Sequence, residues 1–156
     1  SSPFIEKAIY ESCKIKKKIV EKDEKETALR KVLNFGHTFA HAYEAGLGYS
    51  HKLNHGEAVI LGMKTALSFS FKENMLSKSE YNLIINHIDN SGLPSSIKKH
   101  FSIKDLNKIL SFMIKDKKNN SKKINLVLLK NIGKPIFNKQ YSKKKVNLFL
   151  RKFLTN

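Results

Sequence analysis

The chain has 156 residues, of which 40% are hydrophobic and 28% charged, and its formal net charge at neutral pH is +17. This composition predicts one soluble globular domain over residues 1–156, and it excludes a membrane span because no apolar run reaches the roughly 18 residues needed. The single cysteine, Cys13, excludes an internal disulfide framework and is typical of a reducing compartment.

The strong positive charge on its own predicts an anionic partner, such as a nucleic acid. However, only two of the 30 basic residues are arginines, Arg30 and Arg151, whereas proteins that read bases and phosphates favour the bidentate arginine fork. The lysines are also spread along the whole chain. We therefore expect an anionic small substrate rather than a nucleic acid.

The chain opens with two serines and Pro3, a pattern typical of a helix start. Helical spacing then predicts one buried apolar stripe, formed by Ile5, Ile9, Cys13 and Val20. Lys16 falls on this stripe. The pattern alone leaves open whether its stem packs while the ammonium reaches water, or whether it serves a binding site.

Polar side chains recur at helical spacing in the middle of the chain: Glu26, Arg30, Asn34, His37, His41 and Glu44. On one continuous α-helix this spacing would place them on a single face, between apolar flanks that favour burial. Buried polar groups cost free energy unless something satisfies them, so this face predicts a bound ligand or metal.

Gly36 lies inside this predicted helix, although glycine there costs roughly 1 kcal/mol relative to alanine. We therefore expect something to approach the backbone closely beside His37. After a loop over residues 46–54, His55 opens the most apolar segment of the chain. Residues 57–71 are predicted to form the most buried helix, which would hold His55 rigidly at a buried end.

Three further helices and one hairpin are predicted in the remaining sequence. A capping box over residues 77–80 starts one helix, Ser102 caps the next, and residues 146–153 carry the apolar stripe of the last. Residues 124–129 and 136–137 form two short predicted strands joined by a turn. The predicted fold class is therefore mainly α, a helical bundle with a small late β-hairpin.

Histidines are the best candidates for metal ligands. His37 and His41, at i and i+4, have the commonest spacing for two imidazoles that bind one metal from a helix. The glutamate that usually follows the first histidine is replaced by Thr38. A catalytic zinc site takes three protein ligands and one open position, so Glu44 and Glu57 are candidates for a third ligand.

The segments LRKVLNFGHTFAHAYE and HGEAVILGM together resemble the signature of the 3-dehydroquinate synthase family, in the sugar-phosphate cyclase group. The residues that recur in register are Arg30, Asn34, Gly36, His37, His41, His55, Gly56 and Glu57. The resemblance spans residues 5–137 and covers only the family's C-terminal, mostly helical domain. It implies a two-domain enzyme whose N-terminal α/β nucleotide-binding domain has no counterpart in this sequence.

The resemblance also implies a role for individual residues. The metal ligands would be His37 and His55, and the third ligand a glutamate of the N-terminal domain. The residues implied in catalysis are His41, Lys16 and Asn34. The residues implied in substrate binding are Arg30, Lys117 and Glu26.

By the same resemblance, the complete protein would be a lyase that converts 3-deoxy-D-arabino-heptulosonate 7-phosphate into 3-dehydroquinate and phosphate, in the shikimate pathway. Its cofactors would be NAD and a divalent zinc or cobalt ion. A cytoplasmic homodimer is implied, without nucleic-acid or membrane partners, and this chain alone would be inactive. Alternatives are another sugar-phosphate cyclase, a metal-dependent relative of alcohol dehydrogenases, and a non-catalytic basic binding module.

Overall fold

The computed structural model describes residues 2–93, 95–115 and 123–155. Within it the chain forms two compact units, residues 1–34 and residues 35–156. The organisation of all 156 residues as one domain remains a prediction. Among the described residues, no helix combines the length and the apolarity that crossing a bilayer requires.

The first unit consists of helix α1 (Pro3–Lys22), a turn, and the short 3-10 helix η1 (Leu29–Asn34). The predicted start is confirmed, since Pro3 is the first residue of α1 and Ser2 occupies its N-cap position, although the Ser2 side chain makes no capping hydrogen bond. The predicted buried stripe is wrong: no residue of α1 is buried, and Ile5 and Ile9 are 58% and 59% exposed. Helical spacing shows which side chains share a face, but it does not supply the surface that would cover them.

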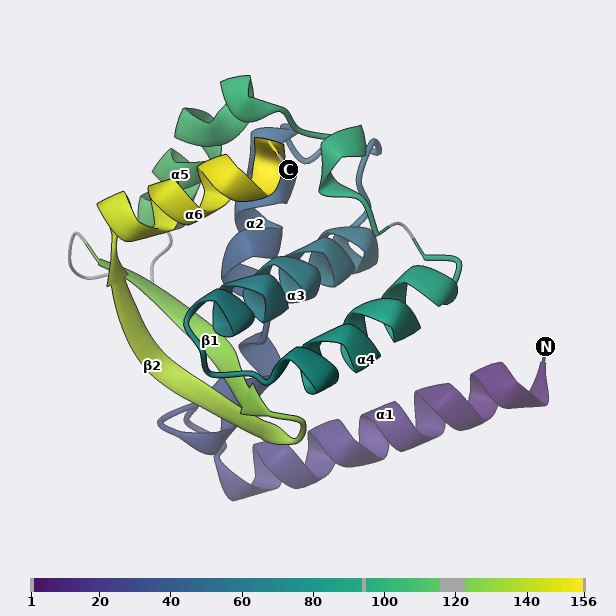
Figure 1. The fold of residues 1–156 in the computed structure, drawn as a ribbon. Helices are drawn as coiled ribbons and strands as arrows, with labels where there is room; N and C mark the ends of the chain where they lie inside the picture. Colours follow the sequence, from purple (N-terminus) through teal and green to yellow (C-terminus); the bar gives the residue numbers. More distant parts are fainter. Residues whose placement is uncertain (1, 94, 116–122, 156) are drawn as a thin grey trace. The chain divides into compact units, whose positions relative to one another are not determined.

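The described residues of the second unit form five α-helices, two further 3-10 turns and a two-stranded antiparallel hairpin (Figure 1). In chain order these are α2 (His37–Gly46), α3 (His55–Lys72), α4 (Lys78–Asn90), η2 (Ile97–Lys99), η3 (Ile103–Asp105), α5 (Leu106–Lys115), β1 (Lys123–Asn131), β2 (Lys134–Ser142) and α6 (Lys143–Thr155). The predicted class, mainly α with a late hairpin, is confirmed.

The core of the second unit surrounds α2 and α3, which cross near its centre (Figure 1). Side chains of α5, α6 and β1 complete this core, while a smaller cluster around Leu67 and Ile88 joins α3 to α4. The expectation that α3 is the most buried helix is confirmed for the number of buried residues, but not for the fraction of its residues that are buried. It buries eight of its 18 residues, whereas α2, which packs against both α3 and α5, buries six of ten.

Glu80 connects the start of α4 to the hairpin turn. The predicted capping box is confirmed, because the Ser77 hydroxyl accepts a hydrogen bond from the Glu80 N–H. The Glu80 carboxylate in turn accepts from the N–H of Ile132 at 3.0 Å. The Ser77 hydroxyl also donates to this carboxylate, at 2.7 Å, and the two donors, with the Ile132 N–H first, lower the pKa of Glu80. One acidic side chain therefore fixes both a helix cap and the adjacent turn.

Candidate metal and substrate site

The predicted continuous helix over residues 30–41 is interrupted at Gly36. The 3-10 helix η1 ends at Asn34, Gly36 adopts a left-handed conformation with φ of 80°, and α2 begins at His37. The expectation that four polar residues share one helix face is therefore wrong. Arg30 and Asn34 belong to the first unit, whereas His37 and His41 belong to the second.

The reason for this break is a close contact between two glycines of the second unit. A Cβ atom on Gly36 would lie 2.5 Å from the backbone nitrogen of Met63. A Cβ atom on Gly62 would lie 2.3 Å from the carbonyl oxygen of Gly36. The predicted close approach beside His37 is thus confirmed, and the partner is the backbone of α3. This contact fixes where α2 begins.

Three imidazoles come together in the second unit. The ring centroid of His37 lies 5.7 Å from that of His41 and 6.0 Å from that of His55, and the His41 and His55 centroids are 6.3 Å apart. Two imidazoles that bind one zinc ion tetrahedrally have centroids roughly 5 Å apart, since each nitrogen lies about 2.0–2.1 Å from the metal. Every pair is close to that separation, so these distances do not select one pair.

Hydrogen bonding separates His37 and His55 from His41. The Nδ1 atom of His37 is 3.3 Å from the carbonyl oxygen of Phe35, and Nδ1 of His55 is 3.0 Å from Oε1 of Glu44. A histidine that donates from Nδ1 keeps Nε2 as a lone-pair atom for a metal, and such outer partners are typical of metal ligands. No hydrogen bond to His41 is found within the described part of the chain.

Glu44 is the group whose role sequence reasoning missed. It lies seven residues after His37 on α2, and its side chain is only 13% exposed, whereas the His55 side chain is 60% exposed. The sequence identified Glu44 as a third-ligand candidate, but the structure places it against the ring nitrogen of His55. The expectation that His55 is held at a buried helix end is wrong, because it is held by this contact at an exposed one.

A small hollow of about 260 Å³ adjoins His41. It is lined by Thr38, His41, Ala42, Ala45, Tyr49, Phe112 and Lys115. The Thr38 hydroxyl donates to the carbonyl of Asn125 at 3.2 Å, which ties this side of α2 to β1. The hollow therefore combines an imidazole, a phenol and an ammonium group, a set suited to an anionic, hydroxyl-rich molecule.

In the first unit, Asp23 organises the turn that carries Arg30. Its carboxylate accepts hydrogen bonds from the N–H groups of Arg30 and Ala28, each at 2.8 Å, and of Thr27 at 2.9 Å. The Arg30 N–H contributes most, and together these donors lower the pKa of Asp23 to about 2. The guanidinium of Arg30 itself donates to the carbonyl of Glu24 at 2.8 Å. A charged turn thus fixes the arginine backbone.

The other predicted site residues of the first unit differ in how they are held. The amide nitrogen of Asn34 donates to Oε1 of Glu26 at 2.7 Å, and Glu26 has a positive φ of 53°. Lys16 is exposed on α1. The structure therefore pairs Asn34 with Glu26 directly, a contact across eight residues that spacing did not predict. Lys117 lies outside the described residues.

Within residues 2–93, 95–115 and 123–155, no group of three or more His, Cys, Asp or Glu side chains is arranged to hold a metal ion. A pair of imidazoles with oriented rings is nevertheless present, and it fits a zinc or cobalt ion in donor type. The third protein ligand of a three-ligand site would then come from outside the described residues. Glu57, the other candidate, is engaged in the α3 capping box with the Asn54 N–H at 2.8 Å.

Comparison of the sequence with known proteins gives one family and consistent relatives. A family model described as 3-dehydroquinate synthase C-terminal matches residues 1–119. The 3-dehydroquinate synthase of Pelagibacter ubique is 63% identical over 99% of this chain, and that of Bradyrhizobium diazoefficiens is 36% identical over 96%. The chain spans 42% and 40% of the lengths of these two relatives.

Comparison of the fold gives solved structures of two synthases. A 2-deoxy-scyllo-inosose synthase, solved with carbaglucose-6-phosphate, NAD+ and Co2+, matches 81% of this chain and 35% of its own, with a TM-score of 0.63 and 22% identity. The 2-epi-5-epi-valiolone synthase of Streptomyces hygroscopicus, solved with NAD+ and Zn2+, matches 86% of this chain and 36% of its own, with a TM-score of 0.66 and 20% identity. At these low sequence identities, the similarity shows a shared fold only.

Proposed function

We propose that this chain, which belongs to the 3-dehydroquinate synthase family, supplies the metal- and substrate-binding part of such an enzyme. The reaction would convert 3-deoxy-D-arabino-heptulosonate 7-phosphate into 3-dehydroquinate and phosphate. The observation that carries the proposal is the pair His37 and His55, each with its Nδ1 atom held by an oxygen. This is the pair that the family signature assigns to the metal.

In this proposal His37 and His55 hold a zinc or cobalt ion through Nε2, with one further ligand from the rest of the enzyme. When bound, the ion acts as a Lewis acid that polarises substrate oxygens. The carbonyl of Phe35 and the carboxylate of Glu44 keep the two rings in the required tautomer and orientation. His41, beside the 260 Å³ hollow, is left to exchange protons with the substrate.

The remaining residues would bind an anionic sugar phosphate. Arg30 presents a planar fork suited to a carboxylate or phosphate, and the Asp23 turn holds its backbone. Asn34 would bind a substrate hydroxyl, with Glu26 orienting its amide. We assign Lys16 and Lys117 to the substrate as two further cations, by family signature alone.

The relatives are more than twice as long as this chain, so a second part of the enzyme enters the proposal. We assign to that part the contacts with NAD and the third metal ligand, which makes this chain inactive by itself. A cytoplasmic homodimer is proposed on family grounds alone. Sedimentation analysis of the complete protein and cell fractionation would test these two points.

A hybrid enzyme tests the proposed reaction. This chain should replace the matching 42% of the Pelagibacter ubique enzyme, to which it is 63% identical. We expect NAD- and metal-dependent phosphate release from the hybrid, and none from this chain alone. A folded hybrid that releases no phosphate, or turnover by this chain alone, would contradict the proposal. Identification of the product separates this reaction from that of another sugar-phosphate cyclase.

Zinc binding to the chain of 156 residues tests the ligand assignment directly. His37→Ala and His55→Ala should each abolish binding measured by calorimetry, while His41→Ala should largely retain it. Glu44→Gln should weaken it about tenfold, as loss of an outer-sphere carboxylate does. Loss of binding in His41→Ala but not in His55→Ala would identify the i, i+4 pair as the site instead.

A further inference from the structure

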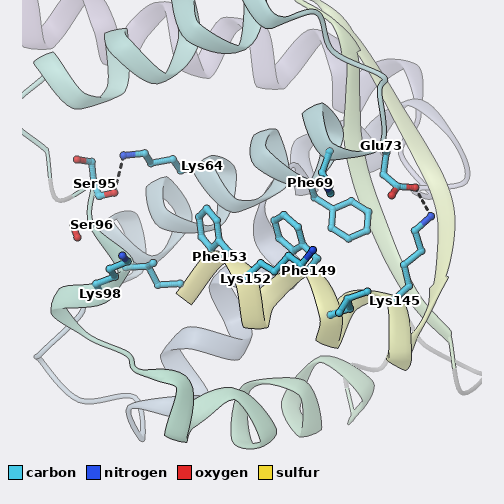
Figure 2. Close-up of a pocket in the computed structure, with 13 residues that line it drawn as sticks. Lys64, Phe69, Glu73, Ser95, Ser96, Lys98, Lys145, Phe149, Lys152 and Phe153 are labelled. Atoms are coloured by element: carbon cyan, nitrogen blue, oxygen red, sulfur yellow. Dashed lines mark hydrogen bonds and ion pairs between the residues drawn. The ribbon is translucent and has the colours of Figure 1, made fainter. Parts of the chain in front are cut away.

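A second concave site lies in the second unit, between α3, α6 and the segment that carries η2 (Figure 2). It is a pocket of about 570 Å³, within the range of sites that hold small organic ligands. The residues that line it are Lys64, Phe69, Lys72, Glu73, Ser95, Ser96, Ile97, Lys98, Lys145, Leu148, Phe149, Lys152 and Phe153.

Aromatic rings form the floor of this pocket. Phe69 meets Phe149 edge to face with centroids 4.8 Å apart, and Phe149 stacks on Phe153 with centroids 5.5 Å apart. Leu148, on the same helix, is 59% exposed at the pocket. Rings in edge-to-face and stacked contact favour a further flat ring, whose burial would also remove this apolar surface from water.

The rim of the pocket is cationic. Lys145 is paired with Glu73, and Lys64 is held by Asp89 and by the carbonyl of Ser95. The other three lysines of the rim have no ion pair within the described part of the chain; they are Lys72, Lys98 and Lys152. A second copy of this chain, with a net charge of +17, would be repelled here, whereas an anion would be attracted.

The two ends of the pocket differ in chemistry. Figure 2 shows Ser95, Ser96 and Lys98 together at one end, and the Glu73–Lys145 ion pair at the other. At the first end the Ser95 side chain is already hydrogen-bonded to Asp89, whereas the Ser96 hydroxyl and the exposed Lys98 ammonium group remain for an acidic substituent. Both ends contain an ion pair, Lys64–Asp89 beside Ser95 and Lys145–Glu73 at the second end, but only the serine end also has the exposed, unpaired Lys98 among the described residues. An acidic group would therefore be placed at the serine end.

We propose that this pocket binds a small aromatic molecule that carries one acidic group. The ring system would lie over Phe149 and Phe153, and the carboxylate, sulfonate or phosphate would meet Lys98 and the Ser96 hydroxyl. A neutral ring would leave the cationic rim unmatched, and a simple inorganic anion would leave the aromatic floor exposed to water.

This inference is independent of the proposed reaction. None of the residues that line the pocket belongs to the candidate metal and substrate site. His55 and Lys64 lie nine residues apart on α3, which is about 14 Å along a helix axis. Failure of this proposal would therefore leave the family assignment and the metal ligands unaffected.

A pair of probes with the same rings and different charge tests the proposal on the 156-residue chain. The anionic probe is 8-anilinonaphthalene-1-sulfonate, and the neutral probe is N-phenyl-1-naphthylamine. We expect saturable binding of one anionic probe per chain, measured by fluorescence, and weaker binding of the neutral probe. Amide chemical shifts of Ser95, Ser96 and Lys98 should change as the anionic probe binds.

Two variants and two matched controls locate the binding. Lys98→Glu reverses a charge about 5 Å from the acidic group, which should raise the Kd of the anionic probe about tenfold and leave the neutral probe unaffected. Leu148→Asp places a carboxylate at the floor of the pocket and should weaken the binding of both probes. The controls, Lys130→Glu and Leu83→Asp, change exposed residues of the same type outside the pocket and should leave both Kd values unchanged.

Three results would overturn the proposal. An equal loss of affinity for the anionic probe in Lys98→Glu and Lys130→Glu would mean that this probe responds only to the net charge of the protein. Equal affinity for both probes, insensitive to Lys98→Glu, would mean that the pocket is an apolar patch without an anion site. Loss of probe binding at higher protein concentration, with a rise in sedimentation coefficient, would mean that a second copy covers the pocket.

Discussion

Replacement of Gly62 by alanine tests the contact that sets α2 against α3. On an open helix surface this change would stabilise the protein by roughly 0.5–1 kcal/mol. Here the new Cβ atom would lie 2.3 Å from the Gly36 oxygen and 2.9 Å from the Ala40 nitrogen, and both are backbone atoms that cannot rotate away. Overpacking of this kind costs about 1–3 kcal/mol, so a net loss of about 1–2 kcal/mol is expected.

For a chain of this length, such a loss corresponds to a fall in Tm of about 2–8 °C. Urea unfolding followed by circular dichroism measures it, and zinc titration shows whether a displaced α2 separates its histidines from His55. Gly56→Ala is the control on the same helix, since a Cβ atom there meets nothing within 4 Å. If Gly62→Ala proved as stable as Gly56→Ala, the tight contact would not hold the two helices.

Two further predictions concern polar groups that the fold itself satisfies. The pKa of Asp23 is lowered to about 2, chiefly by the Arg30 N–H, so its carboxylate should stabilise the first unit fully above about pH 4 and lose this contribution as the pH falls towards 2. Asp23→Asn should remove this dependence of stability on pH, which amide chemical shifts of the first unit would follow. The buried hydroxyl of Tyr43 lies 2.9 Å from that of Thr65, so Tyr43→Phe should lower the free energy of unfolding, measured in urea, by about 1 kcal/mol. Tyr49→Phe removes the hydroxyl of an exposed side chain and should cause no measurable change.

The elements that sequence reasoning located correctly are those whose signals are local. The Ser77 capping box, the apolar stripe that follows Ser102 and the late hairpin all depend on residues within a few positions of one another. The α3 start at His55 is equally local, because Asn54 and Glu57 form its capping box. Caps and periodicity therefore predicted most boundaries of the second unit.

Features that depend on distant partners were not predictable in the same way. Spacing placed Arg30 and His41 on a single face of one helix. That helix does not exist, because Gly36 must pass the backbone of Gly62. The glycine itself predicted a close approach, but nothing near it in the sequence identifies Gly62 as the partner or predicts the helix break. The exposure of Ile5 and His55 was missed for a related reason. The apolar stripe around Ile5 and the apolar helix after His55 both favour burial, but they do not show which surface would cover these side chains.

The choice between His41 and His55 as partner of His37 shows what three-dimensional contacts add to sequence. Spacing alone favoured His41, and the three ring separations, 5.7, 6.0 and 6.3 Å, are too similar to decide. The oxygens at Nδ1 support our proposal of His55, because Glu44 and the Phe35 carbonyl each lie within hydrogen-bond distance of one ring nitrogen and leave Nε2 for a metal, whereas no such contact to His41 is found among the described residues. Glu44 reaches His55 across 11 residues, so the evidence for this pair lies in a contact that helical periodicity does not encode.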